Sequence, residues 1–267
     1  MKQGSELESR IETVQGAGAV RALAGDGYAL VGAQDLACVL NLESQALESL
    51  GRSWERLRPD EYLRDGGRYR FRRHGCFVED LNISRPGDVD VASTNQGPKL
   101  TQSPHRAHWQ PMTYNALHGG MERWFEPLES SVAESVVFRR MLTGFGALFA
   151  RLRPVREWFI EAHQFRIDTA HGIGRPTPEG AHRDGVDFVA LVLVSRSEVR
   201  GGETRVFQAQ GNSGIRFTMH EPWSALLMDD TRVIHETTPI QPLRAGTTGH
   251  RDTLVLTYRE RGFQAPG

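Results

Sequence analysis

The segment EWFIEAHQFRID, residues 157–168, opens a series of seven short runs that are rich in β-branched and aromatic residues. The six runs that follow it are DFVALVLVS (187–195), ETRVFQAQ (203–210), GIRFTMH (214–220), SALLMDD (224–230), RVIHETTPI (232–240) and RDTLVLTYR (251–259). Turn residues separate the runs, and short strands at this spacing are typical of a sandwich or barrel rather than of alternating strands and helices. The sequence therefore predicts a second half made of β-strands.

The first half of the chain mixes helical and extended patterns. Residues 43–57 carry apolar side chains at helical spacing, whereas residues 67–73 alternate as a strand does. Residues 131–152 predict a long helix whose buried stripe consists of Val132, Val136, Val137, Met141, Leu142 and Phe145. Residues 88–111 are rich in Pro, Gly and polar residues, which indicates a long loop of the kind that closes over active sites.

The length and organisation of the chain favour one mainly β domain with α additions. A chain of 267 residues suits a single large core, and neither a repeat nor a linker marks a second domain. We therefore predict one domain over residues 1–267, with an α/β portion over about 1–152 and a β core over about 153–262. The helices are expected to pack on one face of that core, because an apolar sheet face needs cover.

Composition and charge point to a small-molecule ligand. The chain has 32 basic and 33 acidic residues, so its net charge of −1 attracts neither nucleic acid nor an anionic membrane. Residues 1–24 hold neither the apolar region of a secretory signal nor a membrane span. Cys38 and Cys76 are too few for a disulfide framework or a cysteine-rich zinc site. We expect a cytoplasmic protein, and its oligomeric state stays open.

A candidate metal site lies in GAHRDG, residues 180–185, where His182 and Asp184 are two positions apart. In an extended segment these two side chains point the same way, so an imidazole and a carboxylate can share one ion. His235, which lies 51 positions after Asp184 (235 − 184), is the expected third ligand. Two imidazoles and one carboxylate leave the opposite side of the ion open, and this set suits oxygen-activating Fe(II), whereas structural zinc usually has four ligands.

A second candidate element is RDT, residues 251–253, at the start of the last β run. On a strand, Arg251 and Thr253 face the same side. A guanidinium with a hydroxyl beside it can bind the distal carboxylate of a dicarboxylate. The alternatives are that Arg251 makes a surface ion pair, or that another arginine, such as Arg244, holds the dicarboxylate.

Several segments resemble the 2-oxoglutarate/Fe(II) dioxygenase family typified by L-isoleucine dioxygenase, whose members hydroxylate free amino acids. They are HRDGVDFVALVLVSRSEVRGGETRVF (182–207), DDTRVIHETTPI (229–240) and GHRDTLVLTYR (249–259), with GRYRFRRHG (67–75) and YNALHGGMERWFEPLE (114–129) upstream. The resemblance thus covers most of the chain from about Tyr69.

The resemblance implies a double-stranded β-helix, a jelly-roll of cupin-like type. It implies that His182, Asp184 and His235 bind iron, and that Arg251, with Thr253 beside it, binds 2-oxoglutarate. It also implies an enzyme that uses Fe(II), O2 and 2-oxoglutarate to hydroxylate a free amino acid or cyclic imino acid, with release of succinate and CO2.

The substrate contacts are open to more than one interpretation. An amino acid carries a carboxylate and an ammonium, which call for an arginine and an acidic acceptor. Gln164 and Arg166 share one face of the run that leads to the metal loop, and this face points either to solvent or into the pocket. Asp187 is a candidate for accepting the ammonium, or it caps a turn. His105 and His108 are interpreted as surface histidines.

Other functions remain compatible with the sequence. One is a cupin-like protein that binds Mn(II), Ni(II) or Zn(II) without 2-oxoglutarate chemistry, and another is a non-catalytic binding barrel. A third is a peptide or protein hydroxylase that docks its partner on residues 88–111. We prefer a free amino acid, because the resemblance points there and the chain has no charged tract suited to a macromolecule.

Overall fold

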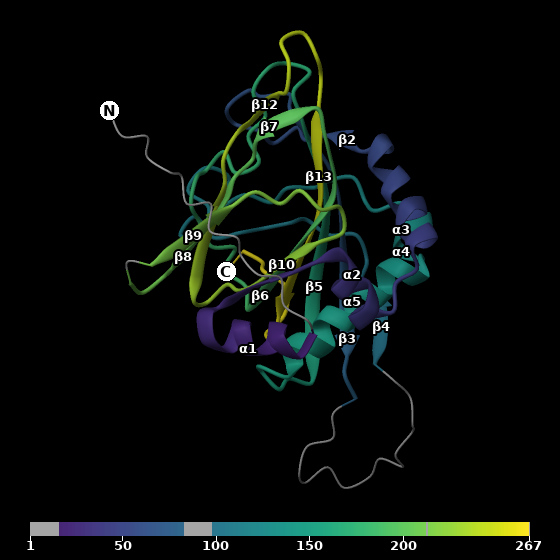
Figure 1. Ribbon diagram of the computed structural model, residues 1–267. Coiled ribbons are helices and arrows are strands. Elements are labelled where there is room, and N and C mark those ends of the chain that lie inside the picture. Colours follow the sequence, from purple (N-terminus) through teal and green to yellow (C-terminus); the bar gives the residue numbers. More distant parts are fainter. Residues whose placement is uncertain (1–15, 83–97, 212, 267) are drawn as a thin grey trace, which may run out of the picture.

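An antiparallel sheet of eight strands forms the centre of the computed structural model, which describes residues 16–82, 98–211 and 213–266 (Figure 1). Seven strands follow the order β1-β10-β6-β13-β5-β3-β2, and β4 pairs with β3. The strands are β1 (Tyr28–Val31), β2 (Arg58–Pro59), β3 (Arg70–Asp80), β4 (Lys99–Gln102), β5 (Glu157–Asp168), β6 (Phe188–Ser197), β10 (Ala225–Asp229) and β13 (His250–Arg259). All pairings in the sheet are antiparallel, as expected for a jelly-roll.

A smaller sheet faces one side of this large sheet. It has the order β11-β8-β9, formed by β8 (Thr204–Gln208), β9 (Gly214–Phe217) and β11 (Val233–Thr237). Val189 and Leu191 of β6 pack against Val206 of β8 in the apolar layer between the two sheets. A further pair of strands, β7 (Val199–Gly201) and β12 (Ile240–Pro242), lies nearby. Two facing antiparallel sheets make the double-stranded β-helix that the family resemblance implied, and each of the seven β runs predicted from the sequence contains a strand.

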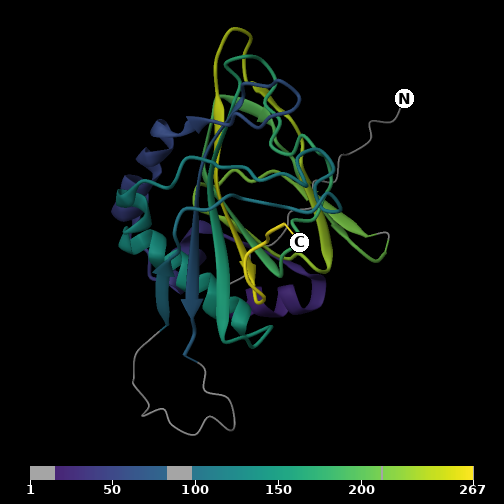
Figure 2. The ribbon, with the colours of Figure 1, turned by 180° about the vertical axis from the view of Figure 1, so that it is seen from behind.

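Helices cover the other side of the large sheet, which confirms the expected arrangement (Figures 1 and 2). They are α1 (Gly16–Asp26), α2 (Ala33–Leu40), α3 (Ser44–Gly51), the 3-10 helix η1 (Arg52–Arg56), α4 (Ser130–Ala133) and α5 (Val136–Ala150). Phe149 of α5 stacks on Phe188 of β6, with ring centroids 4.6 Å apart. The predicted stripe is buried except at Val136, which is 65% exposed. Val137 and Met141 lie one turn apart on the buried face of α5. Val136, the first residue of α5, lies beside this face and is exposed.

The N-terminal half contributes strands as well as helices to the large sheet. β3 pairs with β5 over eleven residues, and β1 extends the sheet beyond β10. The predicted strand at residues 67–73 therefore starts later and runs further than its alternation indicated. Within the predicted loop 88–111, residues 88–97 lie outside the described residues, and β4 occupies Lys99–Gln102. Strands from the N-terminal portion (about 1–152) and from the β core (about 153–262) thus belong to one sheet.

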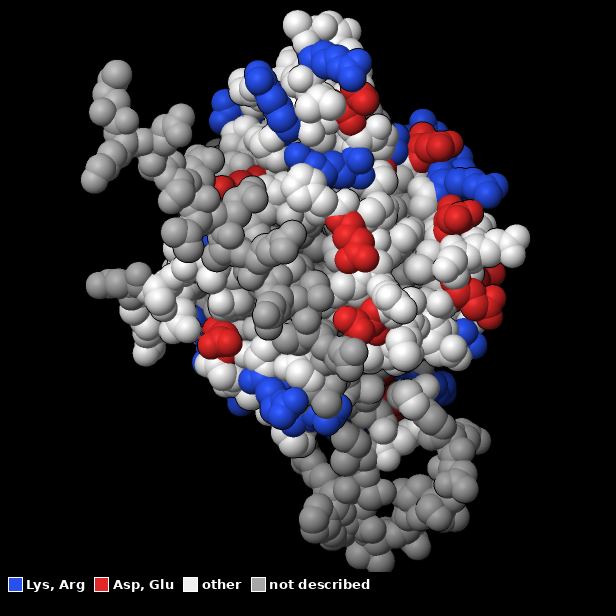
Figure 3. Space-filling model, in the orientation of Figure 1, with Lys and Arg blue, Asp and Glu red and all other residues white. Residues whose placement is uncertain are grey.

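Basic and acidic side chains are interspersed over the face shown in Figure 3, in small groups of both signs. This distribution agrees with the net charge of −1. No helix among the described residues is long and apolar enough to cross a membrane.

Candidate active site

The backbone places two of the predicted metal ligands directly opposite one another. His182 and His235 form an isolated antiparallel bridge, with their N–H and C=O groups joined by reciprocal hydrogen bonds of 3.0 and 2.9 Å. Their imidazole centroids are 4.7 Å apart. Gly180 and Gly185, on either side of His182, both have positive φ angles, which glycine adopts without strain. The bridge thus brings together two residues that are 53 positions apart in the chain (235 − 182).

The third predicted ligand, Asp184, completes a compact group. Its Oδ1 lies 3.7 Å from His182 Nε2 and its Oδ2 lies 3.8 Å from His235 Nε2. One donor atom from each of the three residues lies within 4.8 Å of the others. His182 Nδ1 lies 2.9 Å from the Gly180 carbonyl oxygen, to which it donates, so Nε2 is the nitrogen that can bind a cation once the cation displaces its proton. The donor set and its spacing fit a divalent ion.

Two residues that the sequence interpretation missed hold Asp184 in place, one through its backbone and one through its carboxylate. Asp230, which is fully buried, accepts hydrogen bonds from the backbone N–H groups of Asp184, Gly185 and Val186 at 2.8 to 3.0 Å. Gln110 donates from Nε2 to Asp184 Oδ1 at 3.2 Å. Neither residue belongs to a recognisable motif, because their roles depend on contacts across 46 and 74 positions of chain.

The electrostatics of this group favour a cation. Burial disfavours the charged form of His182, but Asp184 outweighs this effect and raises the pKa of His182 to about 9. Burial also disfavours the ionised form of Asp184, yet the hydrogen bond from His182 and the charges around it hold its pKa well below the usual range. Burial lowers the pKa of His235 to about 4, and the nearby His182 adds to this effect. The group therefore contains an ionised carboxylate, which would attract a metal ion.

Arg251 and Thr253 lie in the same cavity as the three candidate ligands. Arg251 is 3% exposed, and its Nε and Nη2 atoms have no hydrogen-bond partner in the described part of the chain. Burial, followed by repulsion from Arg196, lowers its pKa to about 10, which still leaves it charged at neutral pH. A buried cation with free donors calls for an anionic ligand, so this residue fits a carboxylate. The alternative arginine, Arg244, is exposed.

The cavity lies between the two sheets, and strand parity decides which side chains reach it. On β5 the odd-numbered residues line the cavity: Phe159, Glu161, His163, Phe165 and Ile167. The even-numbered residues face the helical layer, because successive side chains on a strand point to opposite faces. β13 follows the same rule, and its odd-numbered residues from Arg251 to Arg259 line the cavity.

None of the three expected substrate contacts belongs to the cavity lining. Parity accounts for Gln164 and Arg166, which are even-numbered residues of β5, whereas Asp187 lies just before β6. Arg166 forms a bidentate ion pair with Asp252, with distances of 2.8 and 2.7 Å. Gln164 donates to Ser53 Oγ in η1 at 2.8 Å. Asp187 pairs with Arg153 and accepts the backbone N–H of Glu260. Each of these side chains is therefore engaged by the protein itself.

A segment before α4 brings polar side chains into the cavity. Residues 108–123 supply His108, Gln110, Asn115, His118 and Arg123 to the cavity lining. His108 is therefore buried, and its interpretation as a surface histidine was wrong. Gln110 Oε1 accepts hydrogen bonds from both Asn115 Nδ2 and Arg123 Nη2, at 3.2 and 3.0 Å. These contacts fix the side chain that reaches Asp184.

Comparisons with known proteins agree with this geometry. The sequence model of the family described as 2OG-Fe dioxygenase matches residues 51–257. A crystal structure of a bsmA homolog from Methylobium petroleophilum PM1 is 50% identical to the chain, with a TM-score of 0.86, and the match covers 96% of this chain and 97% of that chain.

Two further structures share the fold at lower identity. IDO from Bacillus thuringiensis is 16% identical with a TM-score of 0.70, over 94% of this chain and 98% of that chain. TqaL, described as an Fe(II)/(alpha)ketoglutarate-dependent dioxygenase, is 17% identical with a TM-score of 0.64, over 90% and 85%. Among proteins with curated descriptions, none is similar enough in sequence for a match.

Proposed function

Since the chain belongs to the 2OG-Fe dioxygenase family, we propose that it hydroxylates a free amino acid or cyclic imino acid and converts 2-oxoglutarate and O2 into succinate and CO2. The observation that carries this proposal is that one cavity holds an imidazole–carboxylate–imidazole group and a buried arginine with two donors that no described residue accepts. The family uses Fe(II), 2-oxoglutarate and O2.

We assign the iron to His182, Asp184 and His235. Two imidazoles and one carboxylate bind one face of Fe(II) and leave the other positions to ligands from solution. When they are bound, the iron and 2-oxoglutarate supply the oxidising chemistry that inserts one oxygen atom into a C–H bond. The chain's own residues orient the reactants and keep water out of a cavity whose apolar walls include Val189 and Leu191.

We assign the distal carboxylate of 2-oxoglutarate to Arg251, with Thr253 beside it. Both residues lie on the cavity face of β13, two positions apart. The free Nε and Nη2 atoms of Arg251 can donate two parallel hydrogen bonds to one carboxylate. Such a pair would neutralise the Arg251 guanidinium. Burial of this cation without an anionic partner costs roughly several kcal/mol.

A free amino acid is the substrate that the cavity fits best. The resemblance to the L-isoleucine dioxygenase type supports this class, and the chain shares the fold of IDO. In addition, Arg70 and Arg123 line the cavity together with the acidic Glu161, so the lining complements both charges of an amino acid. The cytoplasmic location and the organisation as one domain stay predictions.

The test is a turnover assay with defined components. The chain is reconstituted anaerobically with Fe(II) and 2-oxoglutarate, exposed to O2, and offered a panel of free amino acids and cyclic imino acids. We expect at least one of them to stimulate succinate release and to gain one oxygen atom by mass spectrometry. Succinate at background level with every compound, in a chain that still binds 2-oxoglutarate, would refute the amino acid substrate. A chain that binds metal but no 2-oxoglutarate would instead be a cupin-like metal protein.

A further inference from the structure

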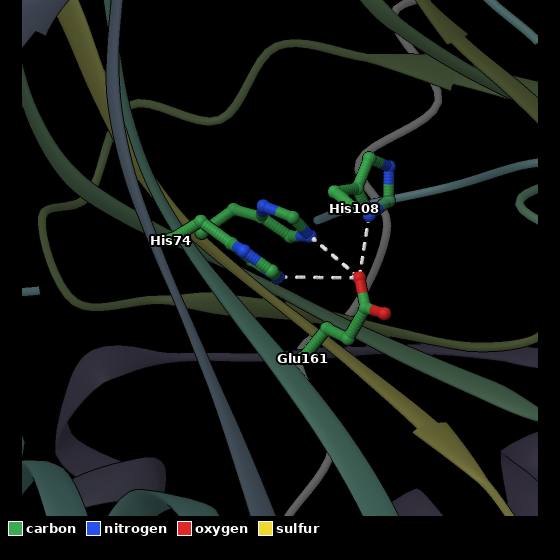
Figure 4. A group of neighbouring side chains, drawn as sticks. His74, His108 and Glu161 are labelled. Carbon is green, nitrogen blue, oxygen red and sulfur yellow. Dashed lines mark hydrogen bonds and ion pairs between the residues drawn. The ribbon is translucent and has the colours of Figure 1, made fainter. Parts of the chain in front are cut away.

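A second buried group of imidazoles and a carboxylate borders the cavity, and neither the iron nor 2-oxoglutarate is assigned to it. It consists of His74 on β3, Glu161 and His163 on β5, and His108 (Figure 4). Three imidazole nitrogens approach the same oxygen, Glu161 Oε2: His108 Nδ1 at 2.5 Å, His74 Nε2 at 3.3 Å and His163 Nε2 at 3.6 Å. Glu161 is 6% exposed, and the three histidines are buried.

The protonation of His163 argues against a metal ion in this group. Arg72 Nη2 lies 2.7 Å from His163 Nδ1. Burial lowers the pKa of Arg72, but a guanidinium stays protonated in proteins and can only donate. His163 Nδ1 must therefore accept this hydrogen bond, and in the neutral ring the proton is on Nε2. That nitrogen has no lone pair for a metal, and its N–H points toward Glu161.

The arrangement of the rings supports the same conclusion. His74 and His163 are stacked, with ring centroids 4.6 Å apart and an interplanar angle of 16°. Arg72 lies over the ring of Phe125 at 3.6 Å and near that of Phe165 at 4.4 Å, which fixes the donor to His163. Nearly parallel imidazoles do not direct their lone pairs at one ion between them. They do present two N–H groups to one side, where Glu161 lies.

These donors stabilise an ionised carboxylate. Burial lowers the pKa of all three histidines, in His108 to about 4, so the rings are neutral and each has one N–H. Burial alone would favour the neutral acid of Glu161, but His108 and the imidazole hydrogen bonds outweigh it and hold the pKa of Glu161 well below the usual range. The group is a buried negative charge held in a fixed direction.

The other oxygen of Glu161 is available to a ligand. Glu161 lines the cavity, and no interaction within the described residues engages its Oε1. Figure 4 shows this oxygen turned away from the rings. In the same cavity, Arg70 Nη2 and Arg123 Nε are buried donors without a partner among the described residues. The cavity therefore offers a free carboxylate oxygen and free guanidinium N–H groups.

We propose that Glu161 Oε1 binds the ammonium group of the substrate, while His74, His108 and His163 hold the carboxylate in position through Oε2. This assignment rests on the proposed function and names the group that recognises the substrate's nitrogen. The free N–H groups of Arg70 and Arg123 then receive the substrate's carboxylate. A compound that lacks the positive charge leaves the buried Glu161 carboxylate unpaired, so the site selects free amino acids over 2-hydroxy acids and N-acylated amino acids.

The test measures binding under anaerobic conditions in the chain loaded with Fe(II) and 2-oxoglutarate. Calorimetry compares the common free amino acids with their 2-hydroxy acid and N-acetyl counterparts. We expect the best-bound amino acid to bind at least about tenfold more tightly than either counterpart, and Glu161→Gln to remove this preference. The Kd for 2-oxoglutarate is expected to stay unchanged in Glu161→Gln. If that variant does not fold, Glu161→Asp keeps the charge but shortens its reach, and we expect the preference to fall in it.

Glu79→Gln is the matched control. Glu79 is a fully buried glutamate on the neighbouring strand β3, and it does not line the cavity. Its variant is expected to keep the preference for amino acids. If the wild-type chain binds amino acids and Glu161→Gln binds them equally well, the assignment is overturned while the proposed function stands. If the wild-type chain binds no amino acid, the proposed substrate class is refuted and the assignment falls with it. More than one metal ion per reconstituted chain, reduced to one by Glu161→Gln, would show a second metal site instead.

Discussion

Two groups in this protein have nearly the same composition, and the partner of one ring nitrogen separates their chemistry. In the group of His182, Asp184 and His235, the Nδ1 of His182 donates to a backbone carbonyl, which leaves Nε2 to bind a cation in exchange for its proton. In the group around Glu161, the Nδ1 of His163 accepts from Arg72, which puts the proton on Nε2. An imidazole of the first kind can bind a cation, and one of the second kind can bind only an acceptor.

The backbone differs between the two groups in a corresponding way. His182 and Asp184 lie in a segment between β5 and β6 that is held by an isolated bridge and by the carboxylate of Asp230. His74, Glu161 and His163 instead lie on two long paired strands, with His74 directly opposite His163. The ladder hydrogen bonds between these strands fix the backbone on which His74, Glu161 and His163 lie. The imidazoles can therefore hold the Glu161 carboxylate in one orientation.

The largest effect is expected from a substitution that tests which of the two groups binds iron. His182→Ala removes one of three ligands, and we expect the iron content after anaerobic reconstitution and dialysis to fall from about one ion per chain to near zero. His163→Ala is the matched control in the other group, and it is expected to retain the iron. Iron retained in His182→Ala, or lost only in His163→Ala, would reverse the assignment of the two groups.

The residues that could be predicted from the sequence are those whose placement is local. His182 and Asp184 are two positions apart in an extended segment, and Arg251 and Thr253 are two positions apart on a strand, so the period of the backbone already aligns each pair. His235 required only that a later strand lie alongside. The β runs of the second half were predicted for the same reason, because alternation and turns are local signals.

The residues that could not be predicted depend on which face of a strand points inward. β5 is buried on both faces, so alternation gives no sign of whether its odd-numbered or even-numbered residues line the cavity. The sequence interpretation chose Gln164 and Arg166, whereas the structure places Glu161 and His163 there. The role of His108 was hidden for another reason, since its partner Glu161 is 53 positions away.

A smaller effect is expected from the removal of Arg251, which is assigned to the distal carboxylate of 2-oxoglutarate. Arg251→Ala removes a buried cation whose Nε and Nη2 donors have no partner among the described residues, so we expect the Kd of 2-oxoglutarate to rise at least about tenfold, or more than about 1.4 kcal/mol. Calorimetry with the iron-loaded chain measures this change. Arg244→Ala, at an exposed position, is the control and is expected to bind 2-oxoglutarate as the wild-type chain does. The opposite result for the two variants would assign the co-substrate to Arg244.

The smallest effect on function is expected from a substitution of Glu79. Glu79 and Glu161 are both buried carboxylates, but imidazoles donate to Glu161, whereas no described residue donates to Glu79. Neither of its oxygens has a hydrogen-bond partner among the described residues, and burial raises its pKa from 4.5 to about 8. The folded chain therefore holds this proton more tightly than the unfolded chain. The resulting stability is complete below about pH 4.5 and is lost as the pH rises to about 8.

Urea unfolding of the wild-type chain and of Glu79→Gln at several pH values between 5 and 8 measures this loss. Glutamine does not ionise, and the other titrating groups are common to both chains, so their contributions cancel in the difference. We expect the free energy of unfolding of the wild-type chain to fall relative to the variant by about 1.4 kcal/mol per pH unit. Two parallel pH profiles would mean that Glu79 is already ionised in the folded chain, and that a buried glutamate here does not need imidazole donors to carry its charge.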